Sequence, residues 1–221
     1  MRVRHRPGRV PRKAARDTRL AAARLYVVTP DAPAERVLEV ASAALRGGAD
    51  MIQLRHKTLP RGELLALARR MRGLIREALF IVNDHVDIAL LSEADGVHLG
   101  PDDLSVTAAR QIAGERLLIG ASASTLQRAE EAVGAGADYL GSGPAFATPI
   151  KAGKQVLGPE GIAAIARGVR VPVFGIGGID ESNVRQLIHA GVQRVCVIRA
   201  VGDAADPEQA TRRLHAMLTV A

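Results

Sequence analysis

The chain has 221 residues, of which 48% are hydrophobic and 2% aromatic, and its formal net charge is +7. This length suits one domain with a substantial core, and the apolar content excludes a largely disordered protein. No apolar run reaches membrane-spanning length and no signal-peptide core is present, so we expect a soluble cytoplasmic protein with no membrane partner.

The positive charge is concentrated in residues 1–24, which hold nine basic residues and one acid, Asp17, so that residues 25–221 carry a net charge of −1. The high isoelectric point therefore describes a basic arm rather than a nucleic-acid-binding face. The arm could resemble a transit peptide or bind polyanions, but its Pro and Gly residues favour a disordered extension. We expect no nucleic-acid partner, except one that the basic arm alone could bind. The chain could also form homo-oligomers.

From residue 25 onward, short apolar runs alternate with longer segments of helical periodicity. Nearly continuous apolar runs are typical of parallel strands that are covered on both faces. The predicted strands are Leu25–Thr29, Asp50–Arg55, Leu79–Asn83, Gly96–Leu99, Leu117–Ala121, Tyr139–Ser142, Val171–Ile176 and Arg194–Ile198. The predicted helices are 34–46, 61–76, 86–92, 105–113, 125–135, 159–167, 181–190 and 207–219.

Eight strand–helix units between residues 25 and 221 fit a compact barrel better than an open sheet. An open doubly wound sheet needs a reversal of strand order that the sequence alone does not exclude. We predict a single-domain α/β fold, a (β/α)₈ TIM barrel.

Residues that follow the predicted strands are unusually polar, and in such a barrel the site lies at these carboxyl ends. Arg55, Lys57 and Lys151 can neutralise an anion such as a diphosphate. Asp84 and Asp103 are oxygen ligands, and two carboxylates together with substrate phosphates make a Mg²⁺ site. The sequence therefore predicts an anion site that contains a metal.

A second phosphate site is predicted near Gly177, Gly178 and the residues after 194–198, where many barrels bind phosphate with backbone N–H groups. Two anion sites imply two phosphorylated substrates, or one substrate with two ends. The glycines alone are weak evidence because they also mark tight turns.

Two neighbouring residues have ordinary structural alternatives. Asp102 could instead cap the helix at 105–113. His98 lies within an apolar strand and is better explained as a packed or supporting histidine than as a catalytic one. The single cysteine, Cys196, lies in an apolar run and is expected to be buried.

Several motifs together give the chain a resemblance to a known family. They are Gln53-Leu-Arg-His-Lys57, Asn83-Asp84, Gly96-Val-His-Leu-Gly100 with Asp103, Gly120-Ala-Ser122, Gly141 to Lys151, and Gly177-Gly178-Ile179. In order and spacing the chain resembles thiamine phosphate synthase over about residues 25–215. The resemblance implies a transferase that joins hydroxymethylpyrimidine diphosphate to hydroxyethylthiazole phosphate with loss of diphosphate, through a dissociative, Mg²⁺-assisted reaction.

The resemblance also implies roles for individual residues. Those expected to hold the diphosphate are Arg55, Lys57, Asn83 and Lys151. Asp84 and Asp103 would bind Mg²⁺, and Gln53 and Ser122 would contact the pyrimidine or the leaving group. Thr148 and Gly178 would hold the thiazole phosphate. Arg55, Lys57, Ser122 and Lys151 are the expected catalytic residues.

The chain departs from the family pattern at three positions. Pro101 replaces the usual Gln, and Ile150 replaces a Thr between Thr148 and Lys151. Arg199 stands where the family has Ser, and it could either bind the thiazole phosphate or block its pocket. The departures leave the diphosphate half of the predicted site intact and alter the thiazole half.

Three other functions compete with this interpretation. A related thiazole tautomerase shares the barrel, but Pro144 stands where its members have a histidine, and Asp84 is an acid that they lack. A sugar-phosphate epimerase needs a facing acid–base pair that the sequence does not supply. A non-catalytic relative could bind nucleic acid through the basic arm.

Overall fold

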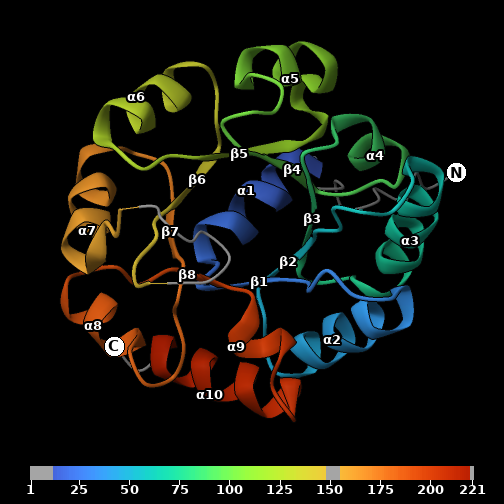
Figure 1. Ribbon diagram of the computed structural model, residues 1–221. Coiled ribbons are helices and arrows are strands. Elements are labelled where there is room, and N and C mark those ends of the chain that lie inside the picture. Colours follow the sequence, from blue (N-terminus) through green and yellow to red (C-terminus); the bar gives the residue numbers. More distant parts are fainter. Residues whose placement is uncertain (1–11, 148–154, 220–221) are drawn as a thin grey trace, which may run out of the picture.

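The structure, a computed structural model, describes residues 12–147 and 155–219, and its centre is a closed barrel of eight parallel strands in chain order (Figure 1). The strands are β1 (Leu25–Val28), β2 (Met51–Leu54), β3 (Leu79–Asn83), β4 (Gly96–Leu99), β5 (Leu118–Ser122), β6 (Tyr139–Ser142), β7 (Val173–Ile176) and β8 (Val195–Val197). Because β1 pairs with both β2 and β8, the sheet is closed. The predicted (β/α)₈ barrel is confirmed, and the open-sheet alternative is wrong.

The helices that follow the strands form an outer ring around the barrel (Figure 1). They are α2 (Ala34–Arg46), α3 (Arg61–Leu74), α4 (Val86–Leu91), α5 (Val106–Ala113), the 3₁₀ turn η1 (Gly114–Arg116), α6 (Leu126–Gly134), α7 (Gly158–Gly168), α8 (Val184–His189), α9 (Arg199–Gly202) and α10 (Pro207–Thr219). All eight predicted helices are present, with ends that shift by up to three residues. The short helix α9 was not predicted.

A side-chain cap and a side-chain turn explain two of the observed helix starts. Helix α5 begins after Ser105, whose Oγ accepts a hydrogen bond from the backbone N–H of Ala108 at 3.2 Å. The alternative in which Asp102 caps this helix is therefore wrong. Helix α8 begins later than predicted because Asp180 and Asn183 close a turn first, with the N–H of Asp180 donating to Asn183 Oδ1 at 3.0 Å.

The core has two layers, because alternate residues of each strand point to opposite faces of the barrel wall. Outward residues such as Val27 and Ile52 pack against the helices. Inward residues fill the barrel, and they include both tyrosines of the chain, Tyr26 and Tyr139, together with Phe174. Three of the five aromatic residues thus fill the barrel interior.

An additional helix, α1 (Arg12–Ala22), precedes the barrel and crosses its axis in projection (Figure 1). Leu20 and Ala23 are 5% and 1% exposed, and they pack with Met51, Leu79 and other inward residues near the amino ends of the strands. The expectation of a disordered arm over residues 1–24 is therefore wrong for residues 12–22. Residues 1–11 lie outside the described part of the chain.

Polar contacts also tie α1 to the barrel. Arg19 forms an ion pair with Asp95 at 2.9 Å and donates to the carbonyl oxygens of Glu77 and Ala78. Arg16 donates to the carbonyl oxygens of Glu115 and Arg116. Two of the eight arginines in residues 1–24, Arg16 and Arg19, thus bind backbone of the barrel. Among the described residues, no helix has the length and apolar character needed to cross a membrane.

Candidate active site

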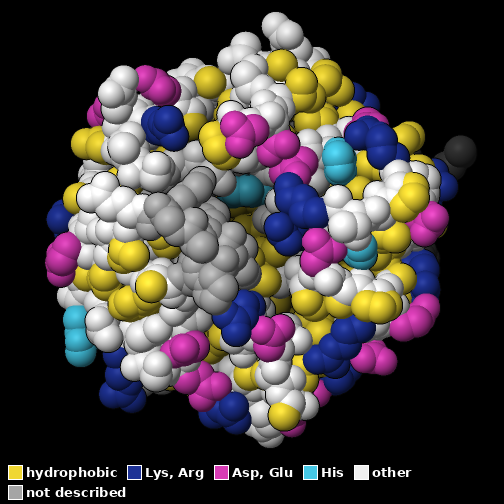
Figure 2. Space-filling view, in the orientation of Figure 1, with side chains coloured by type: hydrophobic (Ala, Val, Ile, Leu, Met, Phe, Trp, Pro, Cys, Tyr) yellow, Lys and Arg dark blue, Asp and Glu magenta, His cyan; other side chains and the backbone are white. Residues whose placement is uncertain are grey.

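The candidate site lies at the carboxyl ends of the strands. Figure 2 shows a central hollow with apolar side chains at its floor and charged side chains of both signs around it. The site residues predicted from the sequence follow consecutive strands there: Gln53, Arg55 and Lys57 at β2, Asn83 and Asp84 at β3, Asp103 after β4, and Ser122 at the end of β5. Because all strands are parallel, their carboxyl ends meet at one mouth.

Asp84 and Asp103 come together at this mouth although 18 residues separate them in the chain. The Asp84 backbone is left-handed, with φ of 64°, and its N–H donates to the carbonyl oxygen of His98 at 2.8 Å. This conformation turns Asp84 toward β4 and is one that Asp tolerates better than most residues. The Asp103 carboxylate accepts the N–H of Gly100 at 2.7 Å and lies within hydrogen-bonding contact of Asp84.

The electrostatics of this carboxylate pair are those of a cation site. Partial burial, followed by the contact with Asp84, raises the pKa of Asp103. Lys57 Nζ lies 2.6 Å from Asp84 Oδ2, and this lysine is the cation that the described residues supply to the pair. Two adjacent carboxylates repel each other unless a proton or cation lies between them.

The donor set fits Mg²⁺. The described residues contain no cluster of three or more His, Cys, Asp or Glu side chains that could enclose a metal ion. Mg²⁺ does not require such a cluster, since it keeps several waters and uses one or two carboxylates together with substrate phosphates. Asp84 and Asp103 supply those carboxylates.

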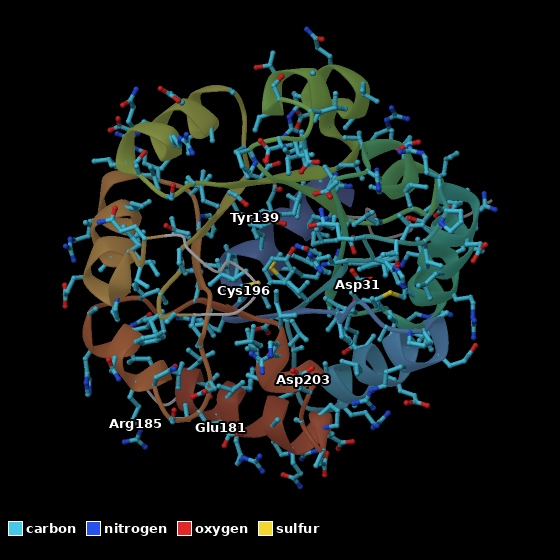
Figure 3. All side chains as sticks on the ribbon, viewed as in Figure 1. Asp31, Tyr139, Glu181, Arg185, Cys196 and Asp203 are labelled. Carbon is cyan, nitrogen blue, oxygen red and sulfur yellow. The ribbon has the colours of Figure 1, made fainter. Side chains whose placement is uncertain are left out.

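Asp31, in the loop after β1, organises the cationic residues and was missed in the sequence. Its carboxylate lies 3.9 Å from Arg55 Nη1 and 3.2 Å from His56 Nδ1, and it accepts the N–H of Lys57 at 3.3 Å. Figure 3 shows Asp31 near the rim of the barrel. The only signal in the sequence was an acid a few residues past a strand end, as Asp84 and Asp103 follow β3 and β4.

A few polar side chains lie among the apolar ones at the floor of the mouth. Gln53 is 4% exposed, and its Nε2 donates to Tyr26 Oη at 2.5 Å. His98 Nε2 lies 3.1 Å from Ser122 Oγ, so this histidine supports a predicted site residue as the sequence suggested. Asn83 is half-buried at the end of β3, in register with His98 on β4.

A second cavity of about 390 Å³ opens between the ends of β6, β7 and β8. Gly177, Gly178, Arg199 and Asp203 are among the residues that line it. A side chain at Gly178 would bring its Cβ within 2.7 Å of the Ala147 carbonyl oxygen, and the backbone φ there is +67°. Arg199 Nε donates to Asp203 Oδ2 at 2.8 Å, and both side chains are more than half exposed.

The structure thus brings most predicted residues to one mouth, in two groups. Around β2–β5 are Gln53, Arg55, Lys57, Asn83, Asp84, Asp103 and Ser122, and around β7–β8 are Gly178 and Arg199. Thr148, Ile150 and Lys151 lie outside the described residues. Pro101 is exposed and lines a further cavity of about 570 Å³ beside Ser122 and Pro144.

The fold and the site define a (β/α)₈ barrel whose mouth gathers acidic and basic side chains. Residues 25–201 match the family described as thiamine monophosphate synthase. The chain is 47% identical over 202 residues to a thiamine-phosphate synthase of Thermosynechococcus vestitus, a match that covers 90% of this chain and 57% of the relative. A thiamine-phosphate synthase of Roseiflexus sp. is 47% identical over 203 residues, with 89% and 86% covered.

A solved structure agrees with these sequences. The thiamine phosphate pyrophosphorylase of Pyrococcus furiosus superposes with a TM-score of 0.83 at 40% identity, and covers 92% of this chain and 98% of its own. The chain belongs to the thiamine monophosphate synthase family. It spans only 57% of the length of the relatives from Thermosynechococcus and Gloeobacter violaceus.

Proposed function

We propose that this chain is a thiamine-phosphate synthase, a transferase that joins hydroxymethylpyrimidine diphosphate to hydroxyethylthiazole phosphate. The observation that carries the proposal is the contact between Asp84 and Asp103 beside Lys57 at the mouth. Several relatives named thiamine-phosphate synthase, 47% identical to this chain, support it. We further propose that the enzyme works in the cytoplasm.

The proposed reaction breaks the bond between the pyrimidine methylene carbon and the diphosphate oxygen. The diphosphate leaves with the electron pair, and the thiazole nitrogen then attacks the resulting pyrimidine methyl cation to form the C–N bond. Such a reaction needs charge neutralisation on the leaving group and a dry, oriented pocket rather than a strong base. The cationic side chains at the mouth suit the first need, and its largely apolar floor suits the second.

In this proposal Arg55, Lys57 and Asn83 bind the diphosphate. Arg55 is 26% exposed and lies beside Asp31. Because this contact already restricts the long side chain, less conformational entropy is lost when the substrate binds. Mg²⁺, bound by Asp84 and Asp103, would neutralise charge on the leaving diphosphate. Lys57, which contacts Asp84 at 2.6 Å, can then direct its remaining N–H donors toward the diphosphate oxygens.

The cavity near β7 and β8 is the proposed site of the thiazole phosphate. Left-handed Gly177 and Gly178 let the chain turn sharply at its wall. Arg199, which also lines the cavity, supplies a cation. We propose that Arg199 binds the phosphate rather than obstructing it, because Arg199 and its ion-pair partner Asp203 both belong to the lining of the cavity.

Purified protein mixed with pyrimidine diphosphate, thiazole phosphate and Mg²⁺ is expected to form thiamine phosphate. The absence of product, together with isomerisation of a thiazole carboxylate phosphate, would show a tautomerase instead. A zero rate in both assays, with retained nucleic-acid binding, would favour the non-catalytic alternative.

Arg199→Ser restores the residue usual in the family and tests the second cavity. We expect the KM for thiazole phosphate to rise about tenfold, the worth of one hydrogen bond between charged groups, with the KM for pyrimidine diphosphate unchanged. A lower KM for thiazole phosphate would show that Arg199 obstructs the pocket. Arg213→Ser, at an exposed ion pair with Glu181 outside the cavity, is the matched control.

A further inference from the structure

A chain of buried hydroxyl and amide groups runs beneath the mouth, inside the barrel. Gln53 Nε2 donates to Tyr26 Oη at 2.5 Å, and Tyr26 Oη lies 3.1 Å from Tyr139 Oη. The three side chains come from β2, β1 and β6 and are 4%, 2% and 0% exposed. Figure 3 shows Tyr139 inside the ring of strands. Polar groups in an otherwise apolar interior cost free energy unless they form hydrogen bonds. The hydrogen-bonded series of Gln53, Tyr26 and Tyr139 is therefore a specific feature of the barrel.

The two hydroxyl groups are held rigidly. The rings of Tyr26 and Tyr139 pack edge-on against each other at 6.0 Å, and against Phe174 at 5.5 and 5.9 Å. Gly120 on β5 makes room for Tyr139, since a Cβ at this position would lie 2.5 Å from Tyr139 Oη. Burial raises the pKa of both tyrosines, so both are neutral phenols that can donate and accept.

In the structure the Gln53 amide directs Nε2 to Tyr26 Oη, so that Oε1 is directed away from this hydroxyl. Gln53 lies on β2, two residues before Arg55. Among the described residues, none donates a hydrogen bond to Oε1. The barrel therefore presents a hydrogen-bond acceptor to whatever enters the mouth at β2.

We propose that Tyr26 is a positioning residue for the pyrimidine substrate: supported by Tyr139, its hydroxyl fixes Gln53 so that Oε1 accepts from the amino group of the pyrimidine. The inference rests on the proposed function. As the diphosphate leaves, positive charge spreads from the methylene carbon to the ring amino group. A hydrogen bond from that amino group strengthens as its charge grows, and so it stabilises the transition state more than the substrate.

Tyr26→Phe removes the hydroxyl and keeps the ring. We expect kcat/KM for pyrimidine diphosphate to fall about tenfold, with the KM for thiazole phosphate unchanged. Calorimetric titration with pyrimidine diphosphate and Mg²⁺, without thiazole phosphate, should show weaker binding. Tyr139→Phe should have a smaller effect in the same direction, because it leaves the bond between Gln53 and Tyr26 in place.

A double-mutant cycle separates positioning from a general structural role. In a Gln53→Ala background, Tyr26→Phe should cause no further loss, because the hydroxyl acts through Gln53. Phe174→Leu is the structural control and should lower the melting temperature without selectivity between substrates. Additive losses, or an equal loss with both substrates, would overturn the proposal.

The calorimetric arm does not depend on turnover. Wild-type protein that binds pyrimidine diphosphate but forms no thiamine phosphate would contradict the proposed function alone. Equal affinities of wild type and Tyr26→Phe would contradict the role of Tyr26 whether or not the synthase reaction is observed.

Discussion

At the scale of single residues, Asp84 combines a backbone requirement with a chemical one. Its φ of 64° belongs to the left-handed region, which Asp and Asn enter more readily than other side chains. Its carboxylate contacts both Asp103 and Lys57. Replacement by Ala would therefore change the backbone preference as well as the charge, whereas Asn changes mainly the charge.

We expect Asp84→Asn to lower Mg²⁺-dependent turnover by at least about 100-fold, the usual cost of losing one charge-stabilising group at a reacting centre. Unfolding by urea should be nearly unchanged. Asp102→Asn, an exposed acid beside Asp103, is the matched control and should keep the wild-type rate. An unchanged rate in Asp84→Asn would refute the metal role of this residue.

The buried tyrosines make stability depend on pH in the alkaline range. Burial raises the pKa of Tyr26 and Tyr139 in the folded state, whereas in the unfolded chain they ionise near their ordinary value of about 10. Their contribution is thus complete below about pH 10 and is lost as the pH rises further, by up to ~1.4 kcal/mol per pH unit for each tyrosine. In urea titrations between about pH 9 and pH 11, Tyr26→Phe should show a shallower decline than wild type, and parallel declines would contradict this prediction.

At the scale of elements, three aspartates bind backbone in the same way at the lower end of the barrel, which is the end formed by the amino ends of the strands, opposite the mouth. Asp50, Asp95 and Asp138 directly precede β2, β4 and β6, and each carboxylate accepts backbone N–H groups at the start of the preceding strand. Gly48 and Gly136, each two residues before one of these aspartates, have left-handed backbones. The hydrogen bonds that these aspartates accept from the neighbouring strand could not be predicted, because they depend on which strands are neighbours.

Helix α1 covers the same lower end, and Leu20 carries the apolar part of that contact. We expect Leu20→Ala to lower the free energy of unfolding by about 2 kcal/mol or more without changing kcat, because the mouth lies at the opposite end of the strands. Leu91→Ala, at a leucine that is 56% exposed, should change it by less than about 0.5 kcal/mol. Equal unfolding midpoints for Leu20→Ala and wild type would show that α1 is not part of the folded core.

At the scale of the whole molecule, part of the basic segment 1–24 belongs to the fold, because α1 covers Arg12–Ala22. A deletion of residues 1–24 would remove α1 together with four arginines before residue 12. With this deletion, a loss of polyanion binding could not be separated from a loss of stability. The informative truncation removes residues 2–11 only.

We expect this shorter truncation to keep the melting temperature and the synthase rate, and to weaken any retention on immobilised DNA, since each arginine contributes to such binding. Removal of residues 2–23 should lower the melting temperature by roughly 5 °C or more, because it exposes the apolar lower end of the barrel. Identical melting temperatures for the two truncations would contradict the contribution of α1.

Much of the site could be predicted because a parallel barrel places every strand end at one mouth. The sequence identified Arg55, Lys57, Asp84 and Asp103 from that rule alone. Asp31 was missed because its importance lies in three contacts with the next loop, and a lone acid after a strand gives no sign of them. Tyr26 was missed because its residue type at an inward position is equally typical of ordinary core packing.

The sequence by itself determined the number of strands and the chemical types at the mouth, because apolar periodicity and residue type are local properties. The tertiary structure decided the contacts that depend on closure: the approach of Asp84 to Asp103, the pairing of Tyr26 with Tyr139 and the docking of α1. Each of these contacts joins different elements of the chain, so only the three-dimensional arrangement of the barrel brings their residues together.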